Sequence, residues 1–423
     1  MTRWRWLFAD LRKRIWFRAA AISFLAVLLA LAGAWLAPLI PYEWSINIGG
    51  EAVDAVLSIL ATSLLAVTTF SLTAMVTAFS GASQQISPRA VHLLIEDRTA
   101  QNALSTFLGG FVFALVSIVA LSTGFYGQEG RVVLFAGTIA MAAAIVITLL
   151  RWIARLVHFG RVEDSIKRIE KQTVTALCQM PAPLVLAGHP QIESSGRATL
   201  RGSRFGFVAH IDRDAISELA VKRAVLIELA VRPGELVDPS TVLMHASEEL
   251  SDEDCENCVD SISISRRRDL SQDPRFGFQL LAEIAVRALS PAVNDPETAI
   301  AALHSALRIL FQYVDGAPPE PRPLAGLVDR PLELQELLEL LLLPVSRDAA
   351  GMLEAAAAIQ YLLGSLAKRM PVAQPFLLAA AREALDRSRK GAMSALDFDR
   401  LQQVHQRELG PGIQQEEISP RST

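Results

Sequence analysis

The residues from Val56 to Ala90 read VLSILATSLLAVTTFSLTAMVTAFSGASQQISPRA, and they hold the strongest structural signal in the chain. A helix needs about 20 apolar residues to cross the hydrocarbon core of a membrane, and this stretch is longer than that. No charged residue occurs between Ala55 and Pro88, yet Ser or Thr recurs at almost every turn. The stretch therefore predicts a transmembrane helix that carries an unusual number of hydroxyl groups.

Three further stretches have the length and composition of a membrane span, so we predict four transmembrane helices within residues 1–160. The predicted spans are Ile15 to Ile40, Val53 to Ser80, Asn102 to Phe125 and Val132 to Leu156. A small-x-small site at Ala32 and Ala34 raises the alternative that the first is a signal peptide. The apolar run continues past that site, and the basic region before it is long. We therefore interpret the first stretch as an uncleaved anchor.

The distribution of basic residues predicts how these spans are oriented. The N-terminus is rich in arginine, the loop PYEWSINIGGE has no Lys or Arg, and Arg151, Arg155 and Arg161 follow the fourth span. Both termini should then be cytoplasmic. The expected location is the bacterial inner (plasma) membrane.

Many of the polar residues of the second span project on one helical face. At 100° per residue they fall within an arc of about 100°. The candidate pathway-lining residues are Ser58, Thr62, Thr69, Thr73, Thr77, Ser80 and Gln84. If several copies assembled with this face inward, they would enclose an uncharged pore lined by hydroxyls. The alternative is that these hydroxyls bond to the preceding turn or across a helix contact, as is common in membranes.

From Arg161 onward the composition changes to that of a soluble protein, so the whole-chain charge of −4 averages two dissimilar parts. The pattern predicts an α+β region that follows the membrane helices. We expect a connecting helix at 161–182, a small β barrel or sandwich with one inserted helix at 183–250, a helical bundle at 251–409 and a disordered tail at 410–423. The three cysteines, all in this part, suit a reducing compartment.

Two short motifs in this part have a functional and a structural interpretation. The spacing of Cys255 and Cys258 is that of half a zinc site, but further ligands are scattered, so we favour a reduced pair on an acidic loop and predict no metal or cofactor. The three arginines of ISRRRDL, Ile264 to Leu270, would form a solvated face or contact lipid headgroups or an acidic partner.

The segment RRRDLSQDPRFGFQLLAEIAVRALSPAVNDPETA, Arg266 to Ala299, closely resembles a family of predicted bacterial membrane proteins catalogued as domain of unknown function 2254. The segment FSLTAMVTAFSGASQQISPR, Phe70 to Arg89, also resembles that family. The resemblance implies inner-membrane placement and this domain order, but no reaction. The signature matches are Asp273, Phe276, Gly277, Arg287, Ser290, Pro291, Asn294, Asp295 and Pro296.

These signature residues have two interpretations. They could form a ligand or subunit contact site, with Arg287 binding an anion. They could instead fix a tight turn between two helices, with Asp295 as the cap of the second helix, Pro296 in its first position and Arg287 paired to an acid such as Asp295. We favour the turn because Ser-Pro and Asn-Asp-Pro are typical of turns and caps.

The sequence allows two hypotheses for function. The first is a homo-oligomeric ion channel with a cytoplasmic gating or assembly domain. The second is a non-conducting, membrane-anchored binding or regulatory protein. The predicted spans hold no central charge of the kind that ion-coupled transporters use, and the chain lacks common catalytic motifs, so we do not predict an enzyme. The expected partners are the lipid bilayer, further copies of the chain and an ion or small anion, and not a nucleic acid.

Overall fold

A computed structural model describes residues 15–36, 50–85, 89, 97–125, 128–156, 161–180, 183–186, 198–316 and 324–410. The basic residues before Ile15, the loop at 41–49 and the tail beyond Gly410 lie outside the described residues. Apart from residues 1–6 and 85–87, which are assigned to the second unit, the chain divides into two compact units between Asp164 and Ser165. We call the part before this division the N-terminal unit and the part after it the C-terminal unit.

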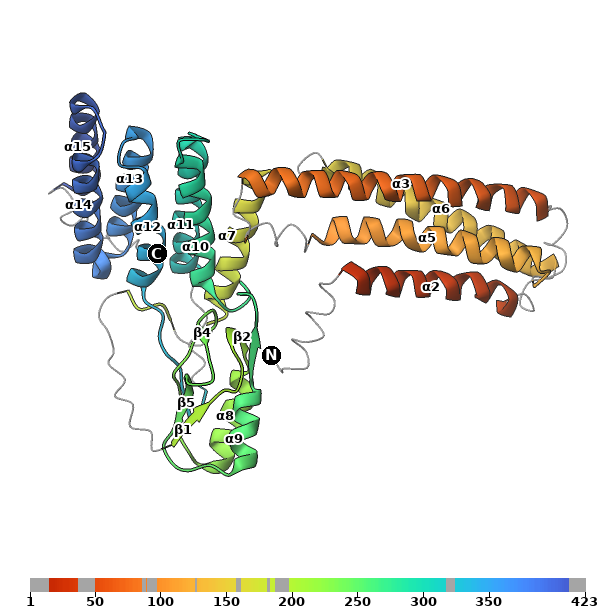
Figure 1. Cartoon of the computed structure of the whole chain (residues 1–423), viewed down its shortest axis with the longest axis horizontal. Helices are drawn as coiled ribbons and strands as arrows, with labels where there is room; N and C mark the ends of the chain where they lie inside the picture. The colour runs from red at the N-terminus through yellow and green to blue at the C-terminus, as the bar shows by residue number, and fades with distance from the viewer. Residues whose placement is uncertain are drawn as a thin grey trace, which may run out of the picture. The chain divides into compact units, whose positions relative to one another are not determined.

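The described part of the N-terminal unit is a set of long helices (Figure 1). They are α2 (Ile15–Leu36), α3 (Gly50–Gln85), α5 (Arg98–Ser122) and α6 (Gln128–Leu156). By length and composition, the helical segments able to cross a membrane are Val53–Gly81, Arg98–Ser122 and Gly130–Leu156. Over the described residues, α2 contributes only a shorter apolar segment, Phe17–Leu31. Three of the four predicted spans are thus found, and the first one stays a prediction.

Close packing in the N-terminal unit depends on small residues. A Cβ atom added to Gly109 of α5 would lie 2.7 Å from Cγ2 of Ile22 in α2, so α2 and α5 can approach only because Gly109 has no side chain. Helix α3 instead packs through larger side chains: Leu57, Leu64 and Met75 are all buried. The two modes of packing leave one long side of α3 uncovered by this unit.

One charged cluster joins the ends of the helices in the N-terminal unit. The side chain of Asp97 caps α5 by accepting a hydrogen bond from Ala100 N at 2.9 Å. Arg155, near the end of α6, donates from Nε to Asp97 at 3.0 Å and from Nη2 to Asp164 at 2.7 Å. The charge of Arg155 is thus neutralised by Asp97 and Asp164. Because Asp97 also caps α5, the cluster fixes the start of α5 and the end of α6 relative to each other.

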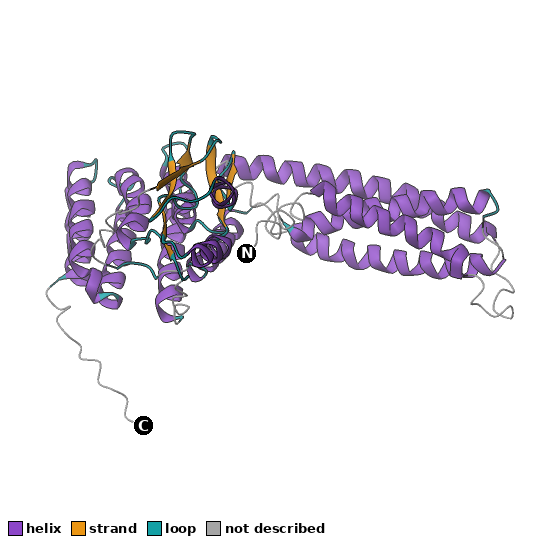
Figure 2. Ribbon diagram, turned by 90° about the horizontal axis from the view of Figure 1, so that it is seen from below, coloured by secondary structure: helices purple, strands orange, loops and turns teal. Residues whose placement is uncertain are grey.

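The C-terminal unit combines helices with short strands (Figure 2). Its helices are α7 (Val162–Cys178), which begins before the division, α8 (Arg213–Arg223), α9 (Asp252–Asp260), α10 (Pro274–Leu289), α11 (Pro296–Asp315), α12 (Leu334–Asp348), α13 (Leu353–Arg369), η3 (Pro371–Ala373), α14 (Gln374–Lys390) and α15 (Ala395–Leu409). Helices α10 to α15 occupy the region where the sequence predicts a bundle. An α+β fold follows the membrane helices, as the sequence predicts.

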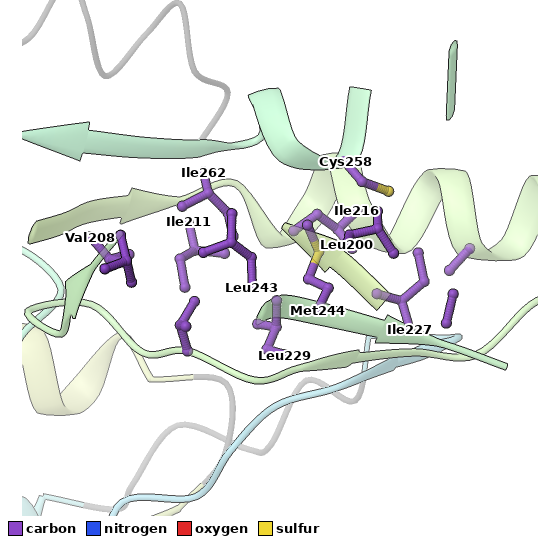
Figure 3. Packing of buried hydrophobic residues seen from close by; sticks show 14 of the residues in the cluster. Leu200, Val208, Ile211, Ile216, Ile227, Leu229, Leu243, Met244, Cys258 and Ile262 are labelled. Atoms are coloured by element: carbon purple, nitrogen blue, oxygen red, sulfur yellow. The ribbon is translucent and has the colours of Figure 1, made fainter. Parts of the chain in front are cut away.

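The strands form two small sheets. They are β1 (Ala198–Arg201), β2 (Gly206–Ile211), β3 (Ile227–Leu229), β4 (Leu236–Val237), β5 (Val242–Ala246), β6 (Ile262–Ser265) and β7 (Leu327–Val328). One sheet has the order β1-β5-β3-β7 and the other β4-β2-β6. Val208 and Ile262 from the second sheet share one apolar core with Leu229 and Met244 from the first (Figure 3). This shared core gives the region a sandwich-like architecture.

The structure corrects three details of the predicted β region. Strands β6 and β7 come from beyond residue 250, so the predicted boundary at 250 cuts through the sheets. Two helices, α8 and α9, lie within the region, where we predict one. The run PLVLAG, Pro183 to Gly188, has the composition of a strand, but its described residues form only an isolated bridge, between Val185 and Glu333. Strands this short leave little period-two pattern in a sequence, which explains the errors.

The cysteine motif also differs from its prediction. Cys255 and Cys258 lie on α9 and not on a loop, and Ser251 caps that helix. Cys258 belongs to the apolar core of the two sheets, and burial raises the pKa of its thiol to about 11. The described residues contain no group of three His, Cys, Asp or Glu side chains placed to hold a metal ion. The helical spacing of the two cysteines therefore serves packing.

Candidate functional site

The hydroxyl-bearing side of α3 is exposed in the N-terminal unit. Leu57, Leu64 and Met75 on the other side are buried against neighbouring helices. The candidate lining residues with an exposed side chain are Ser58, Thr62, Thr69, Thr73, Thr77 and Ser80. Gln84 is in the helix, but its side chain lies outside the described part. These hydroxyls are therefore not glue between the described helices of one chain.

Several of these hydroxyls are satisfied by the helix itself. Thr62 donates to the carbonyl of Ser58 at 2.9 Å, Thr69 to that of Leu65 at 2.9 Å, and Thr73 to that of Thr69 at 3.0 Å. A threonine bonded in this way can face lipid at little cost. Apolar side chains share the exposed side, for example Ile59 at 66% exposure. The geometry thus suits an uncharged lining as well as a lipid-facing surface.

The first half of the family-like signature surrounds a buried carboxylate. Asp273 caps α10 by accepting a hydrogen bond from Phe276 N at 3.3 Å. Its side chain is 0% exposed and receives two hydrogen bonds from Arg268, at 2.9 Å from Nε and 2.5 Å from Nη2. Burial raises the pKa of Asp273, although the charges of Arg268 and Arg275 act in the opposite direction. The run of three arginines suggested a solvated face, but Arg268 is not part of one, because it binds the buried Asp273.

The turn before β4 needs glycine to approach this carboxylate. Gly234 has φ +86°, a left-handed conformation that favours glycine. A Cβ atom at Gly234 would lie 1.8 Å from Oδ2 of Asp273. The turn at Pro233 and Gly234 therefore does more than reverse the chain, because it leaves room for the buried acid of α10.

A second carboxylate holds two arginines beside Asp273. Glu336, in the first turn of α12, accepts hydrogen bonds at 2.9 Å from both Nη atoms of Arg232 and from Nη1 of Arg275. Burial disfavours the charged form of Glu336, but Arg232 and Arg275 outweigh it, so the pKa of Glu336 is lowered. Glu235 adds weaker contacts to Arg232 at 3.3 Å and Arg275 at 3.4 Å. The turn before β4, the start of α10 and the start of α12 are thereby held together by charge-assisted hydrogen bonds.

These charges border a small pocket. It encloses about 380 Å³ of space, counting its open mouth, and lies where α8, α10 and the segment before α12 meet. The arginines at its wall are Arg213, Arg232, Arg275 and Arg330, and the acids are Asp273 and Asp329. Arg213 donates from Nε to Oδ2 of Asp329 at 2.5 Å. A pocket walled by several arginines can bind a small anion.

The second half of the signature forms the turn between α10 and α11. Asn294 has φ +51°, and its N–H donates to the carbonyl of Ser290 at 2.8 Å. Asp295 caps α11 through Thr298 N at 3.1 Å, with Pro296 in the first turn, as predicted. Pro291 is an exposed member of the same turn. This half therefore forms a turn and a helix cap, the geometry that the structural interpretation expects.

The sequence led us to expect that Arg287 pairs with Asp295, but it does not. The carboxylate of Asp295 is occupied by Thr298, whose Oγ1 donates to Oδ2 at 2.6 Å. Within the described residues, the half-buried guanidinium of Arg287 has neither a hydrogen bond nor an ion pair. Helix α10 spans 16 residues, and at 1.5 Å per residue it separates the two halves of the signature by roughly 20 Å. The signature residues do not form a single site.

Gly277 of the signature allows a close helix contact. A Cβ atom at this position would lie 1.9 Å from Oγ1 of Thr173 in α7. Thr173 is fully buried, and its hydroxyl bonds back to the carbonyl of Ile169 at 2.7 Å. Gly277 therefore lets α10 lie directly against α7.

Several of the charged residues around Asp273 and Glu336 could not be predicted from the sequence. Arg232 and Glu336 lie 104 residues apart, so no local pattern links them. The available signals were weak: charges flank the turn at Pro233 and Gly234, and Glu336 is only one of three glutamates in LELQELLELLLL, residues 332–343. A carboxylate in an otherwise apolar helical stretch is a reason to look for a buried partner.

Comparison with known proteins gives relatives without an assigned activity. An uncharacterized protein of Mycobacterium bovis is 27% identical over 271 residues, covering 60% of this chain and 51% of the relative. An uncharacterized protein of Mycobacterium tuberculosis gives the same values, 27% over 271 residues with 60% and 51% coverage. The chain thus spans about half the length of the curated relatives it matches. No solved structure matches it. Residues 12–365 match the family described as Predicted membrane protein (DUF2254), and the chain belongs to that family.

Proposed function

We propose that the protein is a homo-oligomeric ion channel of the bacterial inner membrane, in which α3 of each copy lines the pathway. Both termini are cytoplasmic in this proposal, and the C-terminal unit serves gating or assembly. One observation carries it: the hydroxyl side of α3 is exposed in the single chain, directly opposite the side that packs on the other helices.

The argument rests on what a row of hydroxyls can do when copies assemble. A long uncharged helix with one exposed polar side can place that side around a shared axis, where the hydroxyls meet water and ions. The residues from Ala55 to Pro88 carry no charge, so such a lining would impose no strong preference for one sign of ion. The hydrogen bonds from Thr62, Thr69 and Thr73 to the backbone still leave each oxygen able to accept another.

The test is single-channel recording of the purified full chain in a planar bilayer, with and without membrane tension. Thr73→Asp should be tolerated and should shift permeability toward cations, because the new charge would lie in the pathway. Leu72→Asp is the matched control: it has the same depth, is turned by about 100°, and Leu72 is 48% exposed. A charge facing lipid costs about 2.5 to 3.5 kcal/mol at a helix centre, so the control should lower the amount of inserted protein.

Two outcomes would contradict the channel. One is a silent bilayer from protein shown to be folded and oligomeric. The other is equal damage from Thr73→Asp and Leu72→Asp. Either result would favour the alternative, a non-conducting membrane-anchored binding or regulatory protein. The specific support for that alternative is the arginine-rich pocket of the C-terminal unit.

A further inference from the structure

The pocket between α8, α10 and the segment before α12 combines hydrogen-bond donors and an acceptor that have no partner within the described part of the chain. We propose that it binds a small oxyanion that carries a proton, of the class of hydrogen phosphate or a protonated phosphate group. The proposal concerns the C-terminal unit alone and does not depend on whether the protein conducts ions.

The arginines of the pocket divide into neutralised and available ones. Arg232 and Arg275 are held by Glu336, and Nη2 of Arg275 also donates to the carbonyl of Pro233 at 2.8 Å. Arg213 uses only its Nε, on Asp329, so within the described residues its two Nη groups have no acceptor. The Nη groups of a guanidinium are the edge that binds phosphate in a bidentate manner.

Arg330 is the second available cation. Its single contact among the described residues is a weak one of 3.5 Å to Oε1 of Glu235, and its side chain is 53% exposed. At the pocket wall Asp273 is balanced by Arg268. Arg232 and Arg275 are balanced by Glu235 and Glu336. The charges left for a ligand are Arg213 and Arg330 against Asp329. The pocket therefore favours an anion.

Asp329 adds selectivity within the class of anions. Its Oδ2 accepts from Arg213, whereas its Oδ1 is buried and has no hydrogen-bond donor within the described residues. A buried acceptor without a donor is unfavourable, and a ligand that brings an O–H would satisfy it. Inorganic phosphate keeps at least one proton at neutral pH, whereas sulfate keeps none. Asp329 should therefore favour phosphate over sulfate.

Two helix ends support the same ligand class. Arg213 is the first residue of α8, and Pro274 and Arg275 open α10, so the positive ends of two helix dipoles lie at the pocket wall.

The test is isothermal titration calorimetry of the full chain, purified in detergent without phosphate, with inorganic phosphate as the probe. We expect saturable binding that weakens about tenfold or more in Arg213→Gln, since one charge-assisted bond is worth that much. The matched control is Arg223→Gln, at the other end of α8, where Arg223 pairs with Asp254 at 2.8 Å; binding should be unchanged. Sulfate should bind at least about tenfold more weakly than phosphate.

Three results would overturn the proposal: no binding up to about 10 mM phosphate, where even a Kd of 1 mM would be seen; equal binding of sulfate; or normal binding by Arg213→Gln. If Arg213→Gln does not fold, Arg330→Gln provides the same test at a more exposed position. A water-soluble short-chain phosphatidic acid identifies the source. Tighter binding than phosphate, with loss in Arg213→Gln, would assign the site to lipid headgroups. Weaker binding would assign it to soluble phosphate.

Discussion

The hydroxyls of α3 in the N-terminal unit and the buried charges of the C-terminal unit find their partners in opposite ways. In the N-terminal unit, hydroxyls of α3 bond to carbonyls four residues earlier in the same helix, as Thr69 does to Leu65. In the C-terminal unit, buried charges are satisfied across elements: Glu336 of α12 binds Arg232 from before β4 and Arg275 of α10. A polar group bonded within its own helix constrains no other segment, whereas a charge bonded across segments fixes their relative positions.

This difference predicts where substitutions are costly. A hydroxyl that is satisfied locally can be lost without leaving a partner unpaired. A buried carboxylate cannot be removed in this way, because its arginine partners then remain buried without a counter-charge. Three experiments, in order of expected effect, test this comparison.

The largest effect is expected for Asp273→Ala. The substitution removes the cap of α10 and leaves Arg268 and Arg275 without their buried carboxylate, which should cost about 3 to 5 kcal/mol. For a unit of this size the unfolding midpoint should fall by roughly 10 °C, as measured by thermal unfolding of the detergent-solubilised full chain. Asp397→Ala is the control, because Asp397 is 38% exposed and pairs with Arg400 at the surface. A similar shift in both variants would show that the buried network has no special role.

A smaller, pH-dependent effect is expected for Glu336→Gln. The pKa of Glu336 is lowered in the folded protein, so its contribution to stability is present above its ordinary pKa of 4.5 and is lost as the pH falls through the lowered value. At neutral pH the substitution should cost about 1 to 2 kcal/mol, since Glu336 is partly exposed and the bonds are charge-assisted.

The measurement for Glu336 is the difference in unfolding midpoint between wild type and Glu336→Gln across pH 7 to about 3. The difference should shrink toward acid pH as wild-type Glu336 becomes protonated. A difference that stays constant, or grows toward acid pH, would mean that the carboxylate is not held ionised by Arg232 and Arg275.

The smallest effect is expected for Thr69→Val. The hydroxyl is exposed and bonded only to Leu65 of its own helix, so the stability of the N-terminal unit should change by less than about 0.5 kcal/mol. Thermal unfolding in detergent should give the wild-type midpoint, while channel conductance should change if α3 lines a pathway. A large loss of stability would indicate that Thr69 is buried against another copy of the chain.

Local features of the fold could be predicted from the sequence. Asp295 and Pro296 announce the start of α11 because a cap acts over three residues. Long apolar runs predict three membrane-length helices, because hydropathy also depends on residues that are close in the sequence. The short strands β6 and β7 were missed, since two to four residues do not show a period and their pairing partners lie far along the chain. The signature was recognised, but not its division between the two ends of α10.

The sequence by itself determined that the chain has membrane-length helices, an α+β part after them and capped helices around SPAVND, because hydropathy and capping depend on neighbouring residues. The tertiary structure decided which side of α3 is covered and which arginines are neutralised. Leu64 is buried while Thr73 is exposed, and Arg232 is paired while the Nη groups of Arg213 lack a partner within the described residues. Those distinctions depend on segments up to 116 residues apart, which only folding brings within hydrogen-bond distance.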